Sequence, residues 1–204
     1  MIAGLILAAG QGKRLGQVKP LLTHDHATLL RMVVERMRAS ALDHLIVVLG
    51  HEASKIVQKI SIGGLKIVIN GEHRMGLSSS LQRGLARMPP RCQAVMVALA
   101  DMPLVTTATI NTLISEYNKG KKGIVVPVYN HQRGHPVIID LKYLEFLLAL
   151  RGDVGAKSVL EAHPKDVHEV PIDSDEVLID VDTREQWNLV KQRLAGAEAV
   201  PAMK

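Results

Sequence analysis

The chain has 204 residues, of which 47% are hydrophobic and only 2% aromatic, and its formal net charge is +5. This length suits one domain with a core of aliphatic side chains. The scarcity of aromatic residues and the lack of a long Lys/Arg run argue against nucleic acid as a partner. Cys92 is the only cysteine, so an intramolecular disulfide and a cysteine-based metal cluster are excluded, and we expect Cys92 to be a small core residue.

Apolar runs of strand length alternate with segments of helical spacing along the first two thirds of the chain. The expected strands are the N-terminal apolar run, 45–49, 65–69, 94–99 and 123–128, and the expected helices are 29–39, 53–60, 81–88 and 107–117. Thr28 is a candidate cap for the first of these helices. The order predicts an α/β fold with three αβα layers around a mostly parallel, Rossmann-like sheet.

The rest of the chain is less regular. Strands are expected over 137–139, 167–170 and 177–179, and helices over 141–150, 156–162 and 184–194. Trp187 is expected to be buried on the last helix. Residues 1–195 are therefore predicted to form one domain, and residues 196–204, which are small, polar and aperiodic, a flexible tail.

A glycine-rich, basic loop follows the first strand. Its residues are Gly10, Gly12 and Gly16 together with Lys13, Arg14 and Lys19. Such a loop after the first strand of an α/β protein usually binds phosphate through backbone N–H groups and fixed positive charge. The dinucleotide fingerprint is excluded because position 15 is Leu, and the P-loop because no Gly-Lys-Ser/Thr occurs. The alternative is an ordinary loop with surface cations.

Carboxylates follow two later segments. Asp101 comes directly after the strand 94–99, where parallel sheets bind their ligands and where Mg²⁺ would find a carboxylate beside phosphate. Asp101 could instead cap the following helix, although Thr106 or Thr107 could also do so. Asp180 and Asp182 occupy alternate positions of an extended segment, so both could face the same site.

Three further segments carry polar groups. Ser78, Ser79 and Ser80 follow Gly76 at the expected start of a helix; one hydroxyl can cap the helix, which leaves donors for a ligand. His135 lies in an Arg-Gly-His-Pro segment, where a structural role is the alternative. The segment 151–155 (Arg-Gly-Asp-Val-Gly) indicates by itself only a turn. The remaining histidines show no metal-ligand spacing on a helix.

Together these segments resemble the molybdenum cofactor cytidylyltransferases and MobA-like NTP transferases. The matching motifs, in the family's order over about residues 2–190, are L-A-A-G-x-G-x-R-x-G-x-x-K, G-L-S-S-S-L, L-x-D-M-P, R-G-H-P-V, L-R-G-D-V-G-A and D-x-D-T. Arg184 replaces the usual proline after the last motif. The resemblance implies the nucleotide-diphospho-sugar transferase fold, with residues 129–180 on the acceptor side.

The resemblance also implies roles for individual residues. The nucleotide would be bound by Leu7, Ala8, Ala9, Gly10, Gly12, Lys13, Arg14, Lys19, Ser78, Ser79 and Ser80. Arg14, Lys19 and Asp101 would be catalytic, and Asp101 and Asp182 would bind Mg²⁺ or Mn²⁺, with Asp180 as the second choice to Asp182. The acceptor would contact Arg133, Gly134, His135, Gly152 and Asp153. Ala9 favours CTP, because the guanylyltransferases of this superfamily tend to have Gly there.

The implied reaction transfers CMP from CTP to the terminal phosphate of molybdopterin, with a molybdenum enzyme as the recipient of the product. The alternatives are a nucleotidyltransferase for a sugar or polyol phosphate, a non-catalytic chaperone that delivers the cofactor, and a dehydrogenase-like dinucleotide binder. The N-terminal apolar run lacks a basic leader, and no apolar run reaches the ~20 residues of a membrane span. The expected location is therefore the cytoplasm, with no membrane partner.

Overall fold

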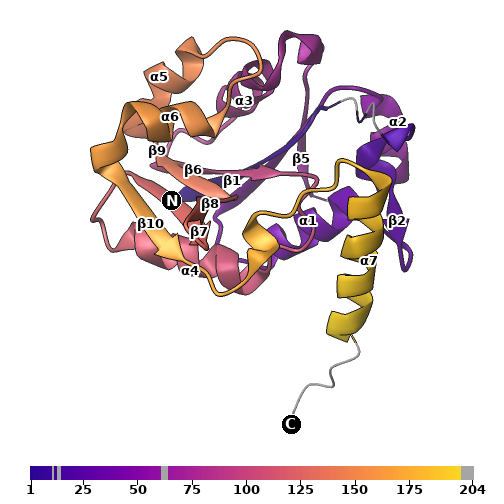
Figure 1. The fold of residues 1–204 in the computed structure, drawn as a ribbon. Coiled ribbons are helices and arrows are strands. Elements are labelled where there is room, and N and C mark those ends of the chain that lie inside the picture. Colours follow the sequence, from indigo (N-terminus) through magenta and orange to yellow (C-terminus); the bar gives the residue numbers. More distant parts are fainter. Residues whose placement is uncertain (11, 13–14, 61–63, 199–204) are drawn as a thin grey trace.

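The computed structural model describes residues 1–10, 12, 15–60 and 64–198. Within these residues, eight strands form a central sheet with the spatial order β10-β7-β9-β6-β1-β4-β5, and β8 pairs with β7 (Figure 1). The strands are β1 (Ile2–Ala8), β4 (His44–Leu49), β5 (Lys66–Ile69), β6 (Ala94–Leu99), β7 (Ile124–Tyr129), β8 (Gln132–Arg133), β9 (Val137–Asp140) and β10 (Val167–Pro171). Pairing is parallel among β6, β1, β4 and β5, and between β7 and β10. β9 and β8 are antiparallel to their neighbours.

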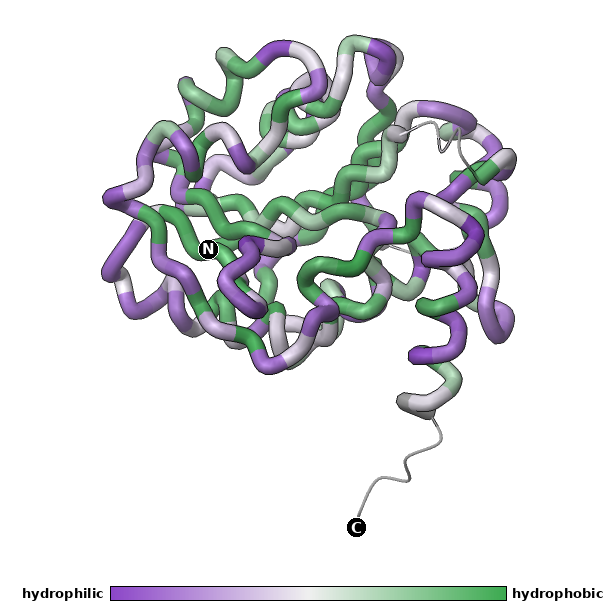
Figure 2. The backbone as a smooth tube through the Cα atoms, in the orientation of Figure 1, coloured by the Kyte–Doolittle hydropathy of each residue, from purple (hydrophilic) through white to green (hydrophobic). Residues whose placement is uncertain are grey.

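Helices cover both faces of the sheet and produce the predicted three layers (Figure 1). Apolar side chains of α1, α2 and α4 pack on one face, and those of α3, α5 and α6 on the other. The helices are α1 (Leu29–Arg38), α2 (Ala53–Lys59), α3 (Leu77–Leu85), α4 (Thr107–Asn118), α5 (Leu144–Ala149), α6 (Ala156–Ala162) and α7 (Arg184–Glu198). Figure 2 shows hydrophobic residues concentrated along the central strands, as expected for strands buried on both faces.

A smaller apolar cluster joins α7 to the loop after β1. Trp187, which is 8% exposed as expected for a buried residue, packs there with Val190 and Leu194. Their partners from the N-terminal region include Leu15 and Leu22. The last helix therefore supports the segment in which the basic loop lies.

Short elements complete the chain. The 3-10 turns are η2 (Lys19–Leu21), η3 (His73–Met75), η4 (Leu141–Tyr143), η5 (Pro164–Asp166) and η6 (Asp175–Val177), and a two-stranded ribbon is formed by β2 (Thr23–His24) and β3 (Ala27–Thr28). Thr28 caps α1 by accepting a hydrogen bond from the Arg31 amide, as predicted. No described helix is long and apolar enough to cross a membrane.

Three sequence-based expectations differ from the structure. Residues 177–179 do not form a strand; η6 ends at Val177, whose carbonyl accepts the amide of His135 instead of joining a ladder. Helix α3 begins at Leu77, four positions before the predicted start, so the serines lie inside its first turn. α7 continues to Glu198, so residues 196–198 of the predicted tail are helical, and the remaining tail residues lie outside the described part.

Candidate active site

Three charged side chains from distant parts of the sequence meet near the carboxyl ends of β1 and β6. Lys19 Nζ lies 2.6 Å from Asp101 Oδ2 and 2.5 Å from Asp182 Oδ1. Both pairs are partly buried. The predicted phosphate-binding lysine and the two predicted metal-binding carboxylates thus form one cluster. Lys13 and Arg14, which were also predicted to bind the nucleotide, lie outside the described residues.

Backbone hydrogen bonds hold these side chains in place. Asp101 follows β6, and its carbonyl accepts the amide of Val181 at 2.9 Å, which docks the 180–182 segment beside it. Lys19 begins η2, whose next residue, Pro20, is buried. The helix after Asp101 is capped by Thr106, whose hydroxyl accepts the amide of Thr109. The carboxylate of Asp101 is therefore not needed as a helix cap.

The charges of the cluster act on one another. Burial alone would lower the pKa of Lys19, but Asp101 and Asp182 outweigh it and raise that pKa above its ordinary value. The pKa of the Asp180 carboxyl is also raised, first by burial and then by the charges of Asp101 and Asp182. Lys19 is consequently a fixed cation, and the carboxylates around it favour the binding of positive charge.

The donor set fits a divalent cation bound together with phosphate. Asp101 Oδ1 is buried and has no hydrogen-bond partner among the described residues, although Oδ2 of the same carboxylate contacts Lys19. Among the described residues, no three His, Cys, Asp or Glu side chains gather into a metal-binding group. Two carboxylates suffice for Mg²⁺, which fills its shell with phosphate oxygens and water.

Gln186 on α7 fixes the aspartate segment and was not singled out from the sequence. Its Oε1 accepts the amides of Asp182 and Thr183 at 2.7 and 2.8 Å, and its Nε2 donates to Asp180 Oδ1 at 3.1 Å. Thr183 Oγ1 in turn accepts the amide of Gln186. This reciprocal arrangement is a capping box, and the Thr-x-x-Gln spacing is the sequence signal that could have found it.

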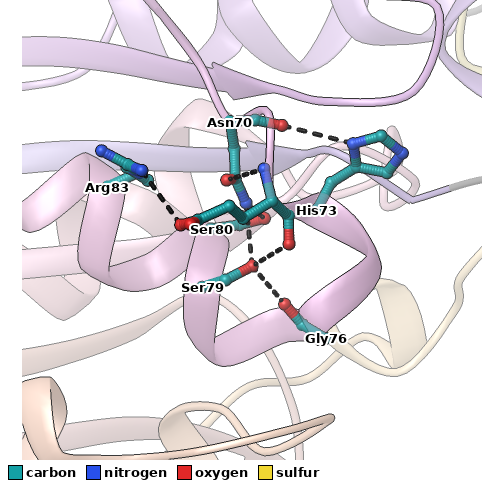
Figure 3. Close-up of polar contacts among 7 residues, drawn as sticks. Asn70, His73, Gly76, Ser79, Ser80 and Arg83 are labelled. Atoms are coloured by element: carbon teal, nitrogen blue, oxygen red, sulfur yellow. Dashed lines mark hydrogen bonds and ion pairs between the residues drawn. The ribbon is translucent and has the colours of Figure 1, made fainter.

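The serine turn is held by a buried asparagine (Figure 3). Asn70 Nδ2 donates to the hydroxyls of Ser79 and Ser80 at 2.9 and 3.0 Å, and Asn70 is fully buried. Ser79 Oγ also donates to the carbonyl of Gly76 at 2.8 Å. The three serines were predicted to bind the nucleotide; their hydroxyls make protein hydrogen bonds here, so a nucleotide would share them. The role of Asn70 was missed because only tertiary packing brings it beneath the turn.

The segment 152–153 lies directly against the serine turn. Ser78 donates to the carbonyl of Gly152 from its amide at 3.2 Å and from its hydroxyl at 2.8 Å. Asp153 Oδ1 accepts the amide of Leu77 at 3.4 Å. Together with the end of β1 they border an open cleft of about 740 Å³, which is large enough for a nucleotide-sized ligand. Its lining residues are Ala9, Gly10, His73, Arg74, Met75, Gly76, Gly152 and Asp153.

The predicted acceptor residues divide into two places. Gly152 and Asp153 line the cleft. Arg133 is exposed on β8 and pairs with Glu169 Oε1 at 2.7 Å. Gly134 packs against the Val177 carbonyl, which a Cβ on Gly134 would approach to 2.2 Å. His135 Nδ1 is buried and has no hydrogen-bond partner within the residues that the structure describes. Burial lowers the pKa of His135, although the hydrogen bond with the Val97 backbone and the charge of Asp101 act to raise it.

The loop after β1 has the conformation that its glycines allow. Leu7, Ala8 and Ala9 are buried at the end of β1. Gly12 and Gly16 have φ of 57° and 62°, a region that favours glycine. A Cβ on Gly12 would come within 3.1 Å of Lys19 Cβ, so the two ends of the loop approach closely.

The family model of the MobA-like NTP transferase domain matches residues 4–167. The chain belongs to this family. Its fold agrees with that membership, because the chain superposes on the crystal structure of Rv0371c from Mycobacterium tuberculosis with a TM-score of 0.84 at 30% identity, covering 94% of this chain and 97% of that one. The protein is thus a nucleotidyltransferase-type enzyme with the nucleotide-diphospho-sugar transferase fold.

A second structure of Rv0371c and one further relative are informative. The Rv0371c complex with manganese from the same organism has a TM-score of 0.82 and 29% identity, over 94% of this chain and 98% of that one. Nicotine blue oxidoreductase from Paenarthrobacter nicotinovorans is 30% identical over 91% of this chain and 94% of its own length. One relative that is similar over most of this chain is therefore named for an oxidoreductase activity.

Proposed function

We propose that this protein is a CTP:molybdopterin cytidylyltransferase, which forms the molybdopterin cytosine dinucleotide and pyrophosphate. The observation that carries the proposal is the Lys19–Asp101–Asp182 cluster at the carboxyl end of the sheet. It combines a cation suited to pair with phosphate and two carboxylates suited to hold a divalent ion, which supports charge neutralisation during nucleotidyl transfer. The acceptor and the base rest on the motif resemblance and on the cleft at the end of β1, which Ala9 and Gly10 line.

In the proposed reaction, an oxygen of the acceptor's terminal phosphate attacks the α-phosphorus of CTP. The bond between the α-phosphorus and its bridging oxygen breaks, and pyrophosphate leaves with the electron pair. A phosphate monoester has a second pKa near ~6 and is already a nucleophile at neutral pH. No general base, serine or cysteine nucleophile is needed, so the protein contributes positioning and charge neutralisation.

The chain's own residues have defined tasks in this proposal. Lys19 and Arg14 would pair with the phosphates and stabilise the leaving pyrophosphate. Asp101 and Asp182 would hold Mg²⁺ or Mn²⁺, whose chemistry when bound is to neutralise phosphate charge. The manganese complex of Rv0371c supports a divalent ion in this family. Gly152 and Asp153 line the cleft, where the pterin would lie.

Ala9 supports CTP over a purine nucleotide. It is 7% exposed and also lines the cleft. A Cβ built on Gly50 would lie 2.8 Å from Ala9 Cβ, so the methyl group of Ala9 has little room to move away from a ligand. A purine is larger than cytosine and would meet this methyl group. Ala9→Gly should therefore raise kcat/KM for GTP relative to kcat/KM for CTP by about 10-fold, which is the discrimination expected from a change of one methyl group.

The test measures pyrophosphate release by the wild type and Ala9→Gly with each of the four NTPs, with and without molybdopterin. The proposal expects release by the wild type only with CTP and molybdopterin. Pyrophosphate release with a sugar or polyol phosphate, and not with molybdopterin, would show that the acceptor is a sugar or polyol phosphate. No release together with cofactor delivery to a molybdenum enzyme would favour a chaperone, and NAD(P)H oxidation would favour the oxidoreductase activity named for one relative.

A further inference from the structure

The position of Lys19 between the two carboxylates has a consequence for metal binding. Its Nζ contacts one oxygen of Asp101 and one of Asp182, at 2.6 and 2.5 Å. A Mg²⁺ ion bound by the same two oxygens would need each of them at about 2.0–2.1 Å. The ammonium group and a divalent cation cannot both occupy the space between these oxygens. Lys19 and the metal therefore compete for one position.

The charge balance shows what the amine contributes there. Asp101 and Asp182 place two negative charges against the amine. Among these groups Lys19 is the cation in contact with both Asp101 and Asp182. A neighbouring opposite charge changes the proton affinity of a carboxylate by about 10- to 1000-fold. The amine should weaken the binding of another cation to the same carboxylates in a similar way.

The surroundings of Lys19 offer the amine a second anion. Lys19 closes the glycine loop and begins η2, and Gly12 lies against its Cβ. Phosphates bound in the loop would therefore lie within reach of a long, flexible side chain. Asp101 also retains one buried oxygen, Oδ1, for which the described part of the chain provides no hydrogen-bond partner. If the amine moved to a phosphate, it would no longer occupy the space between Asp101 Oδ2 and Asp182 Oδ1.

We propose that Lys19 acts as a cation guard, which holds the metal position closed until the nucleotide's phosphates draw the amine away. Free divalent cations then bind weakly to the protein alone, and the metal binds with or after the nucleotide. The part that concerns nucleotide rests on the proposed function, whereas the competition between Lys19 and the metal does not. In this proposal Lys19 both binds the phosphates and makes metal binding follow nucleotide binding.

The test measures Mn²⁺ binding without nucleotide, by electron paramagnetic resonance and calorimetry, in the wild type and Lys19→Met. We expect Lys19→Met to bind Mn²⁺ at least about tenfold more tightly, the lower end of the effect of one neighbouring charge. Mn²⁺ should also raise the melting temperature of Lys19→Met more than that of the wild type. Lys19→Gln, which keeps a hydrogen-bond donor but no charge, should show the same gain.

Lys142→Met is the matched control, because Lys142 Nζ also contacts a carboxylate, Asp166 Oδ2, at 2.7 Å. This variant should bind Mn²⁺ as weakly as the wild type. Equal affinity of the wild type, Lys19→Met and Lys19→Gln would overturn the guard. Pyrophosphate release is measured on the same wild-type preparation. If the wild type releases pyrophosphate but the Lys19 variants gain no Mn²⁺ affinity, the guard alone is refuted. If the variants gain Mn²⁺ affinity but the wild type releases no pyrophosphate, the guard is supported and the proposed substrates are refuted.

Discussion

The two ion pairs of Lys19 depend on each other, because both aspartates contact the same ammonium group. The Lys19 amine is shared by Asp101 and Asp182, which come from segments 81 residues apart. Removing one carboxylate leaves the lysine with a single partner and a metal with a single ligand. The contribution of such a residue to turnover should therefore exceed its contribution to stability, since exposed or partly exposed pairs add little to folding.

Asp101→Asn tests this at the level of a single residue. The amide keeps the size of the side chain and an oxygen that can accept from Lys19, but it removes the negative charge. We expect kcat for CTP-dependent pyrophosphate release to fall at least about 100-fold, as for other electrostatic groups that act on a transition state. The melting temperature and circular dichroism spectrum should stay close to those of the wild type.

Asp173→Asn is the control, because Asp173 is an exposed carboxylate on the segment before η6. Its kcat should equal that of the wild type. Normal turnover by Asp101→Asn would remove Asp101 from the reaction, whatever the stability of the variant.

Among the elements, the wall of the cleft depends on the close approach of two loops. Gly76 precedes α3 with φ 96° and ψ 179°, a conformation that L residues rarely adopt. A Cβ on Gly76 would lie 2.3 Å from the backbone carbon of Gly152. A shift of the Gly152 backbone would break hydrogen bonds, since its carbonyl accepts two of them from Ser78. Glycine at this position therefore sets the spacing between the serine turn and the 152–153 segment.

Gly76→Ala should separate these loops. We expect the free energy of unfolding to fall by roughly 2 kcal/mol, from backbone strain and the displaced contact. The KM for the acceptor should rise, because Gly152 and Asp153 line the cleft. Chemical denaturation and steady-state kinetics measure the two effects. Gly71→Ala is the matched control, since a Cβ there meets nothing within 4 Å; an equal loss in both variants would contradict the argument.

Most elements could be predicted because their signals are local. The apolar runs that became β1, β4 and β6 are continuous, whereas the run of β5 is short and holds Lys66 and that of β7 holds Pro127. Lys19 and Asp101 could be picked out because they follow continuous runs of this kind. Strand order could not be read in this way, because the insertion of β9 between β6 and β7 depends on pairing over long distances. The apolar run 177–179 was misleading for the same reason: it packs without joining a strand.

The site was predictable to a similar degree. The charged cluster followed from motifs at strand ends, whereas the roles of Asn70 and Gln186 depend on which distant backbone groups reach them. For Gln186, the capping-box spacing was a usable signal. The serine hydroxyls illustrate the limit, since sequence alone does not show that Asn70, Gly76 and Gly152 already bond to them.

At the scale of the whole molecule, acid should weaken the protein through a cluster far from the proposed site. Asp166 Oδ2 accepts from Tyr143 Oη at 2.5 Å and contacts Lys142 Nζ at 2.7 Å. Burial alone would raise the pKa of Asp166, but the hydrogen bonds from Lys142, Tyr143 and the Gly123 backbone lower it to about 2. The folded protein therefore binds this proton less readily than the unfolded chain, whose ordinary value is 3.8.

A lowered carboxyl pKa stabilises the fold above the unfolded value, and this stability is lost as the pH falls from about 4 to about 2. Asp166→Asn should thus be less stable than the wild type at pH 7 by roughly 1 kcal/mol, because solvent that reaches the pair screens part of the effect. At pH 2 the difference should shrink, because Asp166 is then about half protonated in the folded protein and almost fully protonated in the unfolded chain. Urea denaturation at both pH values measures this. A difference that is equal at both would show that the charge of Asp166 does not matter.

The central claim is that the Lys19–Asp101–Asp182 cluster serves nucleotidyl transfer. The most direct measurement follows a label from CTP carrying ³²P at the α-phosphorus, in the presence of molybdopterin and Mg²⁺. The account predicts that the label appears in the molybdopterin product with the wild type and not with Asp101→Asn. Label found only in free CMP, or transferred equally well by Asp101→Asn, would contradict it.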